Sequence, residues 1–298
     1  MYNTIFMVKY PHMIRYSPGE VYYFNAHRET DIVLMLQKRY ENFDDRVVYE
    51  IFEKVFKEKI INILKDGNFG TGHVIFFVET ENMKCVFRAN IGLSEKEYYM
   101  GLETKFIEMY KKAGIPVGKL IYADASRSEF NFDFQIMEIL EGKDLETEWK
   151  DIAENTKERY DKLSFQLGQI VARQYKAPVK SWGRFINKTE LEGAKQNAFD
   201  YLVSFLDYDL EVISNAGIFS KDQVEIIRIF FLENKYIFDG MDQAYLVHHD
   251  LADHNIRYIL DKIVAVFDYE NTVAFDPVCE LGSAPTWVCH YPRKEKMI

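Results

Sequence analysis

The pattern of apolar and polar positions divides the chain into a strand-rich part and a helix-rich part. Within residues 74–140, the β-branched and aromatic runs HVIFFVET and KCVFRAN predict a hairpin that turns at Glu81-Asn82. A helix is predicted over 95–112, because Ser94 can cap its start and Ala113-Gly114 can end it. GKLIYA and FDFQIMEIL then predict two more strands.

From residue 144 to 245 apolar residues recur at helical spacing. They predict helices in DKLSFQLGQIVARQY, AKQNAFDYLVSFL and QVEIIRIFFLENKYIF. The polarity changes at Tyr245-Leu246-Val247, a predicted strand that runs into His248-His249-Asp250. IRYIL and IVAVFDY then predict a hairpin across Asp261-Lys262. Residues 1–45 contain a strand-like VYYF and a helix-like DIVLMLQKRY, to which the pattern assigns no role.

Composition narrows the class of protein. A chain of 298 residues suits two domains or lobes, and 48% hydrophobic residues can bury a large core. A net charge of −10 without a basic stripe disfavours a nucleic-acid partner. Three scattered cysteines are too few for a disulfide framework or a thiolate metal site. Because no apolar run approaches a membrane span and no signal-peptide core is present, we expect a cytoplasmic protein without membrane contact.

The strongest chemical pattern lies in VHHDLADHNIRYILDKIVAVFDYENTVAFDPVCEL, residues 247–281. A loop between predicted strands offers His248, Asp250 and Asn255, and the end of the next hairpin offers Asp268. Carboxylate and amide oxygens are hard ligands of the kind that Mg²⁺ takes together with water and substrate phosphates. Asp250 could therefore face a substrate as a base, while Asn255 and Asp268 hold a metal ion.

HHDLADHN followed by VFDYE resembles the catalytic segment of the aminoglycoside phosphotransferase and choline kinase-like family. The resemblance implies an α+β, bilobal protein-kinase-like fold. In it an N-terminal extension (1–45) would precede a small antiparallel-sheet lobe (46–140) and a larger, mainly helical lobe (141–298). VFRAN, the WGRF turn and the long insert before LVHHD resemble the hygromycin-type branch of that family.

The resemblance also implies a role for each residue of the segment. Asp250 would be the catalytic base that deprotonates an acceptor hydroxyl, and His248 would brace the loop. Asn255 and Asp268 would bind Mg²⁺ that bridges the nucleotide phosphates. Asp276-Pro277 with Glu280-Leu281 resembles the family segment that closes the site from below.

Two departures from the family pattern leave a rival hypothesis open. His249 stands where the family has a small residue, and His254 precedes the Asn. The histidine-rich string could instead form a divalent-metal hydrolase site, with the ligands His248, His249, Asp253 and His254. That hypothesis leaves Asn255 and Asp268 without a role.

A nucleotide site is expected in the strand-rich part. Gly67, Gly70 and Gly72 form a glycine-rich turn whose N–H groups could cover phosphates, although an ordinary hairpin turn has the same composition. By resemblance, Arg88 would contact phosphate and pair with Glu103 on the following helix, and Lys84 could substitute for Arg88.

QIMEILEGKDL resembles the linker between the family's two lobes. Met137 would line an adenine pocket there, while Glu138 and Leu140 would provide a backbone carbonyl and N–H. The alternative is that this segment is only the end of a buried strand. After the linker, this chain has Tyr175 where the family often has His.

The acceptor is the least constrained part of the prediction. Asp200, Asp207 and Glu211 sit at i, i+7 and i+11 of a predicted helix, where they would share a face that is either solvated or directed at a polycation. We expect a Mg²⁺-dependent phosphotransferase that uses ATP or GTP and a small-molecule alcohol, with an aminoglycoside-type antibiotic as the leading acceptor. The alternatives are a kinase for a housekeeping metabolite, such as an amino alcohol or sugar, and a nucleotide-binding pseudoenzyme.

Overall fold

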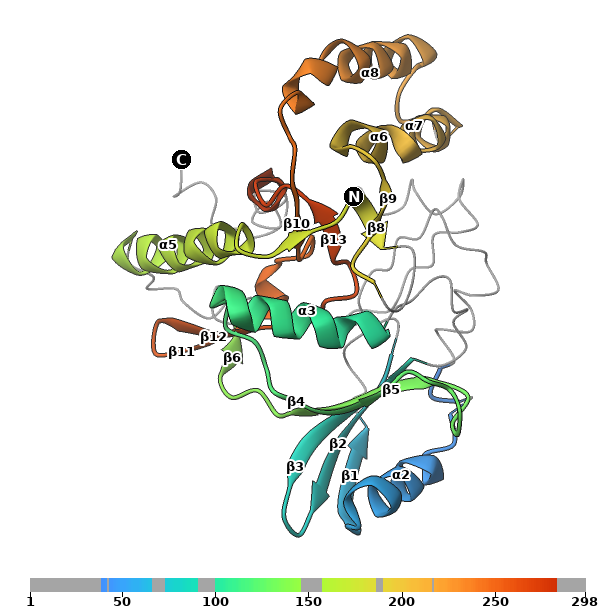
Figure 1. Cartoon of the computed structure of the whole chain (residues 1–298), viewed down its shortest axis with the longest axis vertical. Helices are drawn as coiled ribbons and strands as arrows, with labels where there is room; N and C mark the ends of the chain where they lie inside the picture. Colours follow the sequence, from blue (N-terminus) through green and yellow to red (C-terminus); the bar gives the residue numbers. More distant parts are fainter. Residues whose placement is uncertain are drawn as a thin grey trace. The chain divides into compact units, whose positions relative to one another are not determined.

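The computed structural model describes residues 39–41, 43–65, 73–90, 100–145, 157–185, 190–215 and 217–282 (Figure 1). These residues fall into two compact units. The first draws on Met1–Tyr98, Ile121–Met137 and Leu202–Asp239, and the second on Tyr99–Leu120, Glu138–Tyr201 and Gly240–Ile298. None of the described helices is long and apolar enough to cross a membrane. The glycine-rich turn, VYYF and nearly all of DIVLMLQKRY lie outside the described residues.

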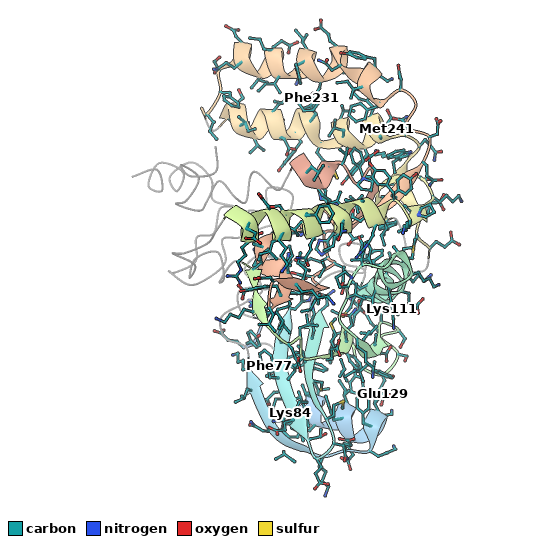
Figure 2. All side chains as sticks on the ribbon, turned by 90° about the vertical axis from the view of Figure 1, so that its left-hand side faces the viewer. Phe77, Lys84, Lys111, Glu129, Phe231 and Met241 are labelled. Atoms are coloured by element: carbon teal, nitrogen blue, oxygen red, sulfur yellow. The ribbon has the colours of Figure 1, made fainter. Side chains whose placement is uncertain are left out.

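The first unit contains a five-stranded sheet of order β1-β2-β3-β5-β4. The strands are β1 (Ile60–Lys65), β2 (Val74–Thr80), β3 (Lys84–Asn90), β4 (Leu120–Asp124) and β5 (Asp133–Glu138). The predicted hairpin is confirmed, since β2 and β3 pair antiparallel with Glu79 opposite Lys84. Figure 2 shows Phe77 and Lys84 on this hairpin. Side chains alternate between the two faces of each strand, as a sheet that buries one face requires.

Helix α2 (Arg46–Phe56) packs its apolar stripe against the sheet (Figure 1). The stripe follows helical spacing: Val48, Ile51 and Phe52 are fully buried. They meet an aromatic core in which the rings of Phe87 and Phe134 stack with centroids 5.7 Å apart. This helix was not predicted, although its spacing is visible in VVYEIFEKVF. The helix covers this face of the sheet, which is therefore not available to a ligand.

The insert before β10 contributes a helix pair to the first unit. It consists of α7 (Leu206–Asn215) and α8 (Lys221–Glu233), preceded by η2 (Val203–Phe205) and followed by η3 (Lys235–Phe238). Ser220 starts α8 through a capping box with Gln223. Figure 2 marks Phe231 on α8.

The second unit combines two sheets with two long helices, α3 (Met100–Ala113) and α5 (Lys157–Gln174). One sheet has the order β7-β10-β13-β8-β9, and the other has the order β12-β11-β6. Helix α5 packs against α3, β10 and β12. The strands are β6 (Lys143–Asp144), β7 (Pro178–Val179), β8 (Trp182–Phe185), β9 (Gly193–Lys195), β10 (Ala244–Val247), β11 (Ile256–Ile259), β12 (Lys262–Val266) and β13 (Val273–Phe275).

The predicted strand at 245–247 and the hairpin after it are confirmed as β10 and as β11 paired with β12. The hairpin turns at Leu260 and Asp261, whose φ angles are 47° and 62°, one residue earlier than expected. Gln166 of α5 holds this turn, because its side chain donates to the Asp261 carbonyl at 2.8 Å and accepts from the Ile263 N–H at 3.0 Å.

The prediction of one helix over AKQNAFDYLVSFL is wrong. Its first residues belong to β9, because Lys195 pairs with Trp182 of β8. The helix begins later, as α6 (Ala198–Leu202), and gives way to the 3-10 turn η2. Pairing with a distant strand has overridden the local helical spacing.

Candidate active site

The loop after β10 is held from inside by His248. This residue is 1% exposed, and its Nε2 lies 2.9 Å from the Phe267 carbonyl oxygen. Its Nδ1 accepts a hydrogen bond from the Asp250 N–H at 3.3 Å, which places the ring proton on Nε2. Burial lowers the pKa of His248 to about 4, and its ring packs on Tyr269. A neutral imidazole therefore connects this loop to Phe267.

Asn255 ties the same loop to the end of the β11–β12 hairpin. Its Nδ2 donates to the Asp250 carbonyl at 3.0 Å, and its own carbonyl accepts from the Phe267 N–H at 3.1 Å. Phe267 is thus bound on its N–H by Asn255 and on its carbonyl by His248. Asp268 follows directly, with a φ of 66° that non-glycine residues rarely adopt. The bond from Nδ2 turns this end of the Asn255 amide toward the loop, so Oδ1 is the side-chain atom of Asn255 that could bind a metal ion.

The carboxyl group of Asp250 has a defined orientation. Asn271 donates its Nδ2–H to Oδ2 of Asp250 at 3.2 Å. Burial raises the pKa of Asp250, and the neighbouring Asp268 acts in the same direction, while His254 and the bond from Asn271 oppose the shift. The bond from Asn271 therefore orients the carboxyl group of Asp250 through Oδ2. Asn271 was missed from the sequence, where its signal is a polar residue three positions after Asp268.

Beneath the loop lies Glu280, a carboxylate that is 2% exposed. Its Oε1 accepts the His249 N–H at 2.8 Å and lies 3.3 Å from Nε2 of Gln174. Burial raises the pKa of Glu280, and hydrogen bonds from the backbone of His249 and from Gln174 oppose this shift. The segment that was expected to close the site from below thus contacts the backbone next to Asp250.

The rival metal-hydrolase hypothesis does not fit this geometry. Both ring nitrogens of His248 already take part in hydrogen bonds to the backbone. Among the described residues, no three of His248, His249, Asp253 and His254 come together as a group of metal ligands. The histidine-rich string therefore shapes the loop and does not form a closed metal site.

The residues expected to bind nucleotide are distributed over both units. Arg88 and Glu103 are both buried, Arg88 in the first unit and Glu103 on α3 of the second, and their pairing stays a prediction. Nη2 of Arg88 lies 2.5 Å from Nε2 of His73. Lys84 forms an exposed ion pair with Glu79, which argues against it as a substitute for Arg88. Gly67, Gly70 and Gly72 lie outside the described residues.

The predicted linker coincides with a passage between the units. The chain leaves the first unit after Met137 and enters the second at Glu138. The N–H of Glu138 donates to the Lys119 carbonyl at 3.0 Å, and its Oε1 accepts from the Lys119 N–H at 2.6 Å. Contacts of Met137, Glu138 and Leu140 with an adenine ring stay a prediction.

Asp200, Asp207 and Glu211 do not share one helix. Asp200 belongs to α6, whereas Asp207 and Glu211 belong to α7, and η2 interrupts the helical periodicity between them. Asp207 already forms an ion pair with Arg228 at 2.9 Å. The prediction that one helix carries all three residues is therefore wrong, and their contact with the acceptor stays a prediction.

Solved structures with a similar fold were found among phosphotransferases. A thermostable mutant of aminoglycoside phosphotransferase APH(4)-Ia, in a ternary complex with AMP-PNP and hygromycin B, aligns with a TM-score of 0.57 at 14% identity, covering 79% of this chain and 75% of that chain. The streptomycin-ATP-APH(2″)-IIa ternary complex aligns with a TM-score of 0.55 at 15% identity, covering 79% and 73%. A putative fructosamine-3-kinase from Thermobifida fusca YX-ER1 aligns at 0.51 and 13% identity, covering 78% and 76%.

At these identities the structural likeness establishes the fold alone, and it confirms the expected α+β, protein-kinase-like class. A search of curated proteins finds no match. The model of the phosphotransferase enzyme family, APH, matches residues 75–294, which include the whole segment from His248 to Glu280. With most of its length matched, from the second strand of the sheet to beyond the loop that carries Asp250, this chain belongs to the phosphotransferase enzyme family.

Proposed function

We propose that this phosphotransferase moves the γ-phosphate of ATP or GTP to a hydroxyl of a small molecule, with Asp250 as the base. The observation that carries the proposal is the fixed position of Asp250. Asn271 donates a hydrogen bond to Oδ2 of its side chain, His248 accepts from its backbone N–H, and Asn255 donates to its backbone carbonyl. As the acceptor oxygen bonds to the γ-phosphorus and the bond to ADP or GDP breaks, the hydroxyl proton passes to Oδ1 of Asp250.

A raised pKa makes the Asp250 carboxylate a stronger base than an exposed aspartate. Burial is the main cause of the shift. A base with a pKa nearer to the working pH accepts a proton more readily, provided that it remains ionised. The environment of Asp250 thus supports proton acceptance, and the bond from Asn271 preserves the ionised form.

The donor set around Asp250 fits a Mg²⁺ ion. Oδ1 of Asn255 and the carboxylate of Asp268 are hard oxygen ligands, and the bond from Nδ2 of Asn255 to Asp250 selects the oxygen for that role. When bound, the ion would neutralise charge on the nucleotide phosphates. Arg88 would contact phosphate, as would the turn with Gly67, Gly70 and Gly72, and Glu103 would pair with Arg88. Met137, Glu138 and Leu140 would receive the adenine ring.

We propose an aminoglycoside-type antibiotic as the leading acceptor. Two of the similar structures carry hygromycin B and streptomycin, and this chain carries a net charge of −10, which would attract a polycation. A housekeeping sugar or amino alcohol is the second candidate, because a putative fructosamine-3-kinase shares the fold.

The test is an ADP-release assay with Mg-ATP, repeated with GDP release from Mg-GTP, over a panel of aminoglycosides, hygromycin B, choline, sugars and fructosamines. Asp250→Asn serves as the blank for each acceptor. Release that depends on one acceptor class and vanishes in the blank supports the proposal. Nucleotide binding without turnover of any acceptor would instead indicate a non-catalytic nucleotide-binding protein.

A further inference from the structure

Two residues near the end of the N-terminal extension bind the backbone at the start of β2. The Tyr40 hydroxyl donates to the Ile75 carbonyl at 3.2 Å and accepts from the Ile75 N–H at 3.1 Å. Nε of Arg39 donates to the His73 carbonyl at 2.6 Å. All four residues belong to the first unit, and the match to the family model begins only at residue 75. Side chains that precede the family match therefore hold the strand with which it starts.

The bonds of Tyr40 lie beyond the last pair of β1 and β2. In the part of the chain that the structure describes, this pairing ends with Lys65 opposite Phe76, the residue after Ile75. Backbone groups that lose a neighbouring strand need another partner, and the Tyr40 hydroxyl satisfies both groups of Ile75. Nζ of Lys65 and Cζ of Arg39 lie 4.1 and 5.0 Å from the centroid of the Tyr40 ring, so cation–π contacts also hold this ring. Tyr40 thus takes the place of a strand neighbour where β1 ends.

The same segment is anchored in the core of the first unit by Phe43. The centroid of its ring lies 5.9 Å from that of Phe76 and 5.4 Å from that of Phe132. The ring of Tyr40 meets Phe76 edge-on, with centroids 6.0 Å apart. Aromatic pairs at these separations stabilise one arrangement of the rings. The position of the Tyr40 hydroxyl is therefore set by packing on the sheet.

His73 connects this segment to the proposed nucleotide site. Its carbonyl accepts from Arg39, while its ring bonds to Arg88, with 2.5 Å between Nε2 and Nη2. A guanidinium can only donate, so Nε2 is the acceptor and the ring proton lies on Nδ1. His73 and Arg88 are 4% and 7% exposed, and a hydrogen bond at such buried groups is costly to lose. A shift of the His73 backbone would therefore move the guanidinium of Arg88.

We propose that Tyr40 and Arg39 are positioning residues for Arg88 and that they act through His73. The inference rests on the proposed function, which assigns a phosphate contact to Arg88. It gives the N-terminal extension a role in nucleotide binding without a contact between Tyr40 and the nucleotide. A guanidinium that is already held in one orientation binds an anion more tightly than a mobile one, because less side-chain freedom is lost on binding.

The experiment measures the Kd of Mg-ATP by calorimetric titration of the full-length chain, in which the stoichiometry gives the folded fraction. Tyr40→Phe removes both bonds to Ile75 and keeps the ring. We expect the Kd to rise about 3- to 10-fold, the range that corresponds to a neutral hydrogen bond, while the acceptor KM stays within about twofold. Hydrogen exchange at the Ile75 amide should accelerate. Arg39→Met, which keeps a long side chain without the donor, should also raise the Kd.

Tyr49→Phe is the matched control for Tyr40→Phe. Tyr49 lies on α2 in the same unit and is 43% exposed, so the loss of its hydroxyl should change neither the Kd nor the exchange at Ile75. The control removes the same atom from the same residue type. It therefore separates the bonds to Ile75 from the general effect of removing a tyrosine hydroxyl.

A double-mutant cycle with Arg88→Ala tests whether Tyr40 acts through Arg88. If it does, Tyr40→Phe has no further effect on the Kd once the guanidinium of Arg88 is absent. Effects of the two changes that multiply in the double variant overturn the positioning role alone. So does an unchanged Kd in Tyr40→Phe when Arg88→Ala weakens binding. If Arg88→Ala binds Mg-ATP as tightly as the parent, the phosphate contact of the proposed function fails, and this role fails with it.

Discussion

The imidazole of His248 accepts a hydrogen bond from the backbone N–H of Asp250, with 3.3 Å between Nδ1 and the amide nitrogen. The other ring nitrogen, Nε2, bonds to the carbonyl of Phe267, the residue before Asp268. One neutral ring therefore connects the loop of the proposed base to the strand end that carries a proposed metal ligand. Protonation of Nδ1 would break the bond to Asp250, so the neutral state is a condition for this geometry.

The first prediction concerns the pH dependence of stability. The pKa of His248 is about 4 in the folded chain, and the ordinary value of 6.5 applies when the chain is unfolded. The unfolded state thus takes up a proton first, and stability that is fully present above pH 6.5 is lost as the pH falls toward 4. The full loss corresponds to about 3 kcal/mol in the free energy of unfolding.

Urea unfolding of the parent and of His248→Gln between pH 7.5 and 4.5 measures this loss. The variant should be less stable at pH 7.5 but should lose less stability on acidification. It keeps a residual slope, since burial lowers the pKa of His249 too. Parallel stability curves for parent and variant would show that His248 does not titrate in this way.

The second prediction is that Asp250→Asn abolishes transfer and leaves nucleotide affinity nearly intact. The base acts on the acceptor, and general-base catalysis with positioning contributes on the order of 10² to 10⁴ in rate. Product release and nucleotide titration are measured on the same preparation. Asp261→Asn is the control, because Asp261 lies at the tip of the β11–β12 hairpin and pairs with Arg159. Equal turnover of Asp250→Asn and the parent would remove Asp250 from the mechanism.

The third prediction concerns the metal ligands. Asp268→Ala should remove Mg²⁺-dependent nucleotide binding, because the proposed site has few protein ligands. Asn255→Ala should weaken it and also loosen the loop, since it loses the bond to the Asp250 carbonyl. Calorimetric titration of nucleotide with Mg²⁺ and with EDTA gives both affinities. If nucleotide bound equally well in both media, Asn255 and Asp268 would not be metal ligands for nucleotide binding.

Features that depend on neighbouring residues could be predicted from the sequence, whereas contacts between distant residues could not. The loop from His248 to Asn255 and the β11–β12 hairpin lie in one continuous segment, so residue order and strand pattern were sufficient. The contact between Gln174 and Glu280 joins residues 106 positions apart, and no local pattern indicates it. The same limit explains the insert, where pairing of β9 with β8 replaced a helix that the spacing favoured. Asn271 lies between these cases, because it is near Asp268 in sequence but its orientation toward Asp250 depends on the fold.

The last prediction concerns the charge of the acceptor and the insert residues Asp200, Asp207 and Glu211. Asp207 is exposed and pairs with Arg228, and water screens an exposed ion pair, so its removal should hardly change stability. If these carboxylates attract a polycation, Asp200→Asn with Asp207→Asn should raise the acceptor KM far more than the nucleotide KM. The difference should shrink as ionic strength rises, because salt screens exposed charges.

The matched control for this double variant is Asp222→Asn with Asp239→Asn, which changes the net charge by the same amount from other positions of the insert. Attraction by overall charge would raise the acceptor KM equally in both double variants. A local acceptor site would raise it only when Asp200 and Asp207 are neutralised. An unchanged KM in that variant, or a neutral or anionic acceptor, would show that the three residues are solvated surface residues without a role in acceptor binding. The exposed side chain of Asp207, which pairs with Arg228, is consistent with that outcome.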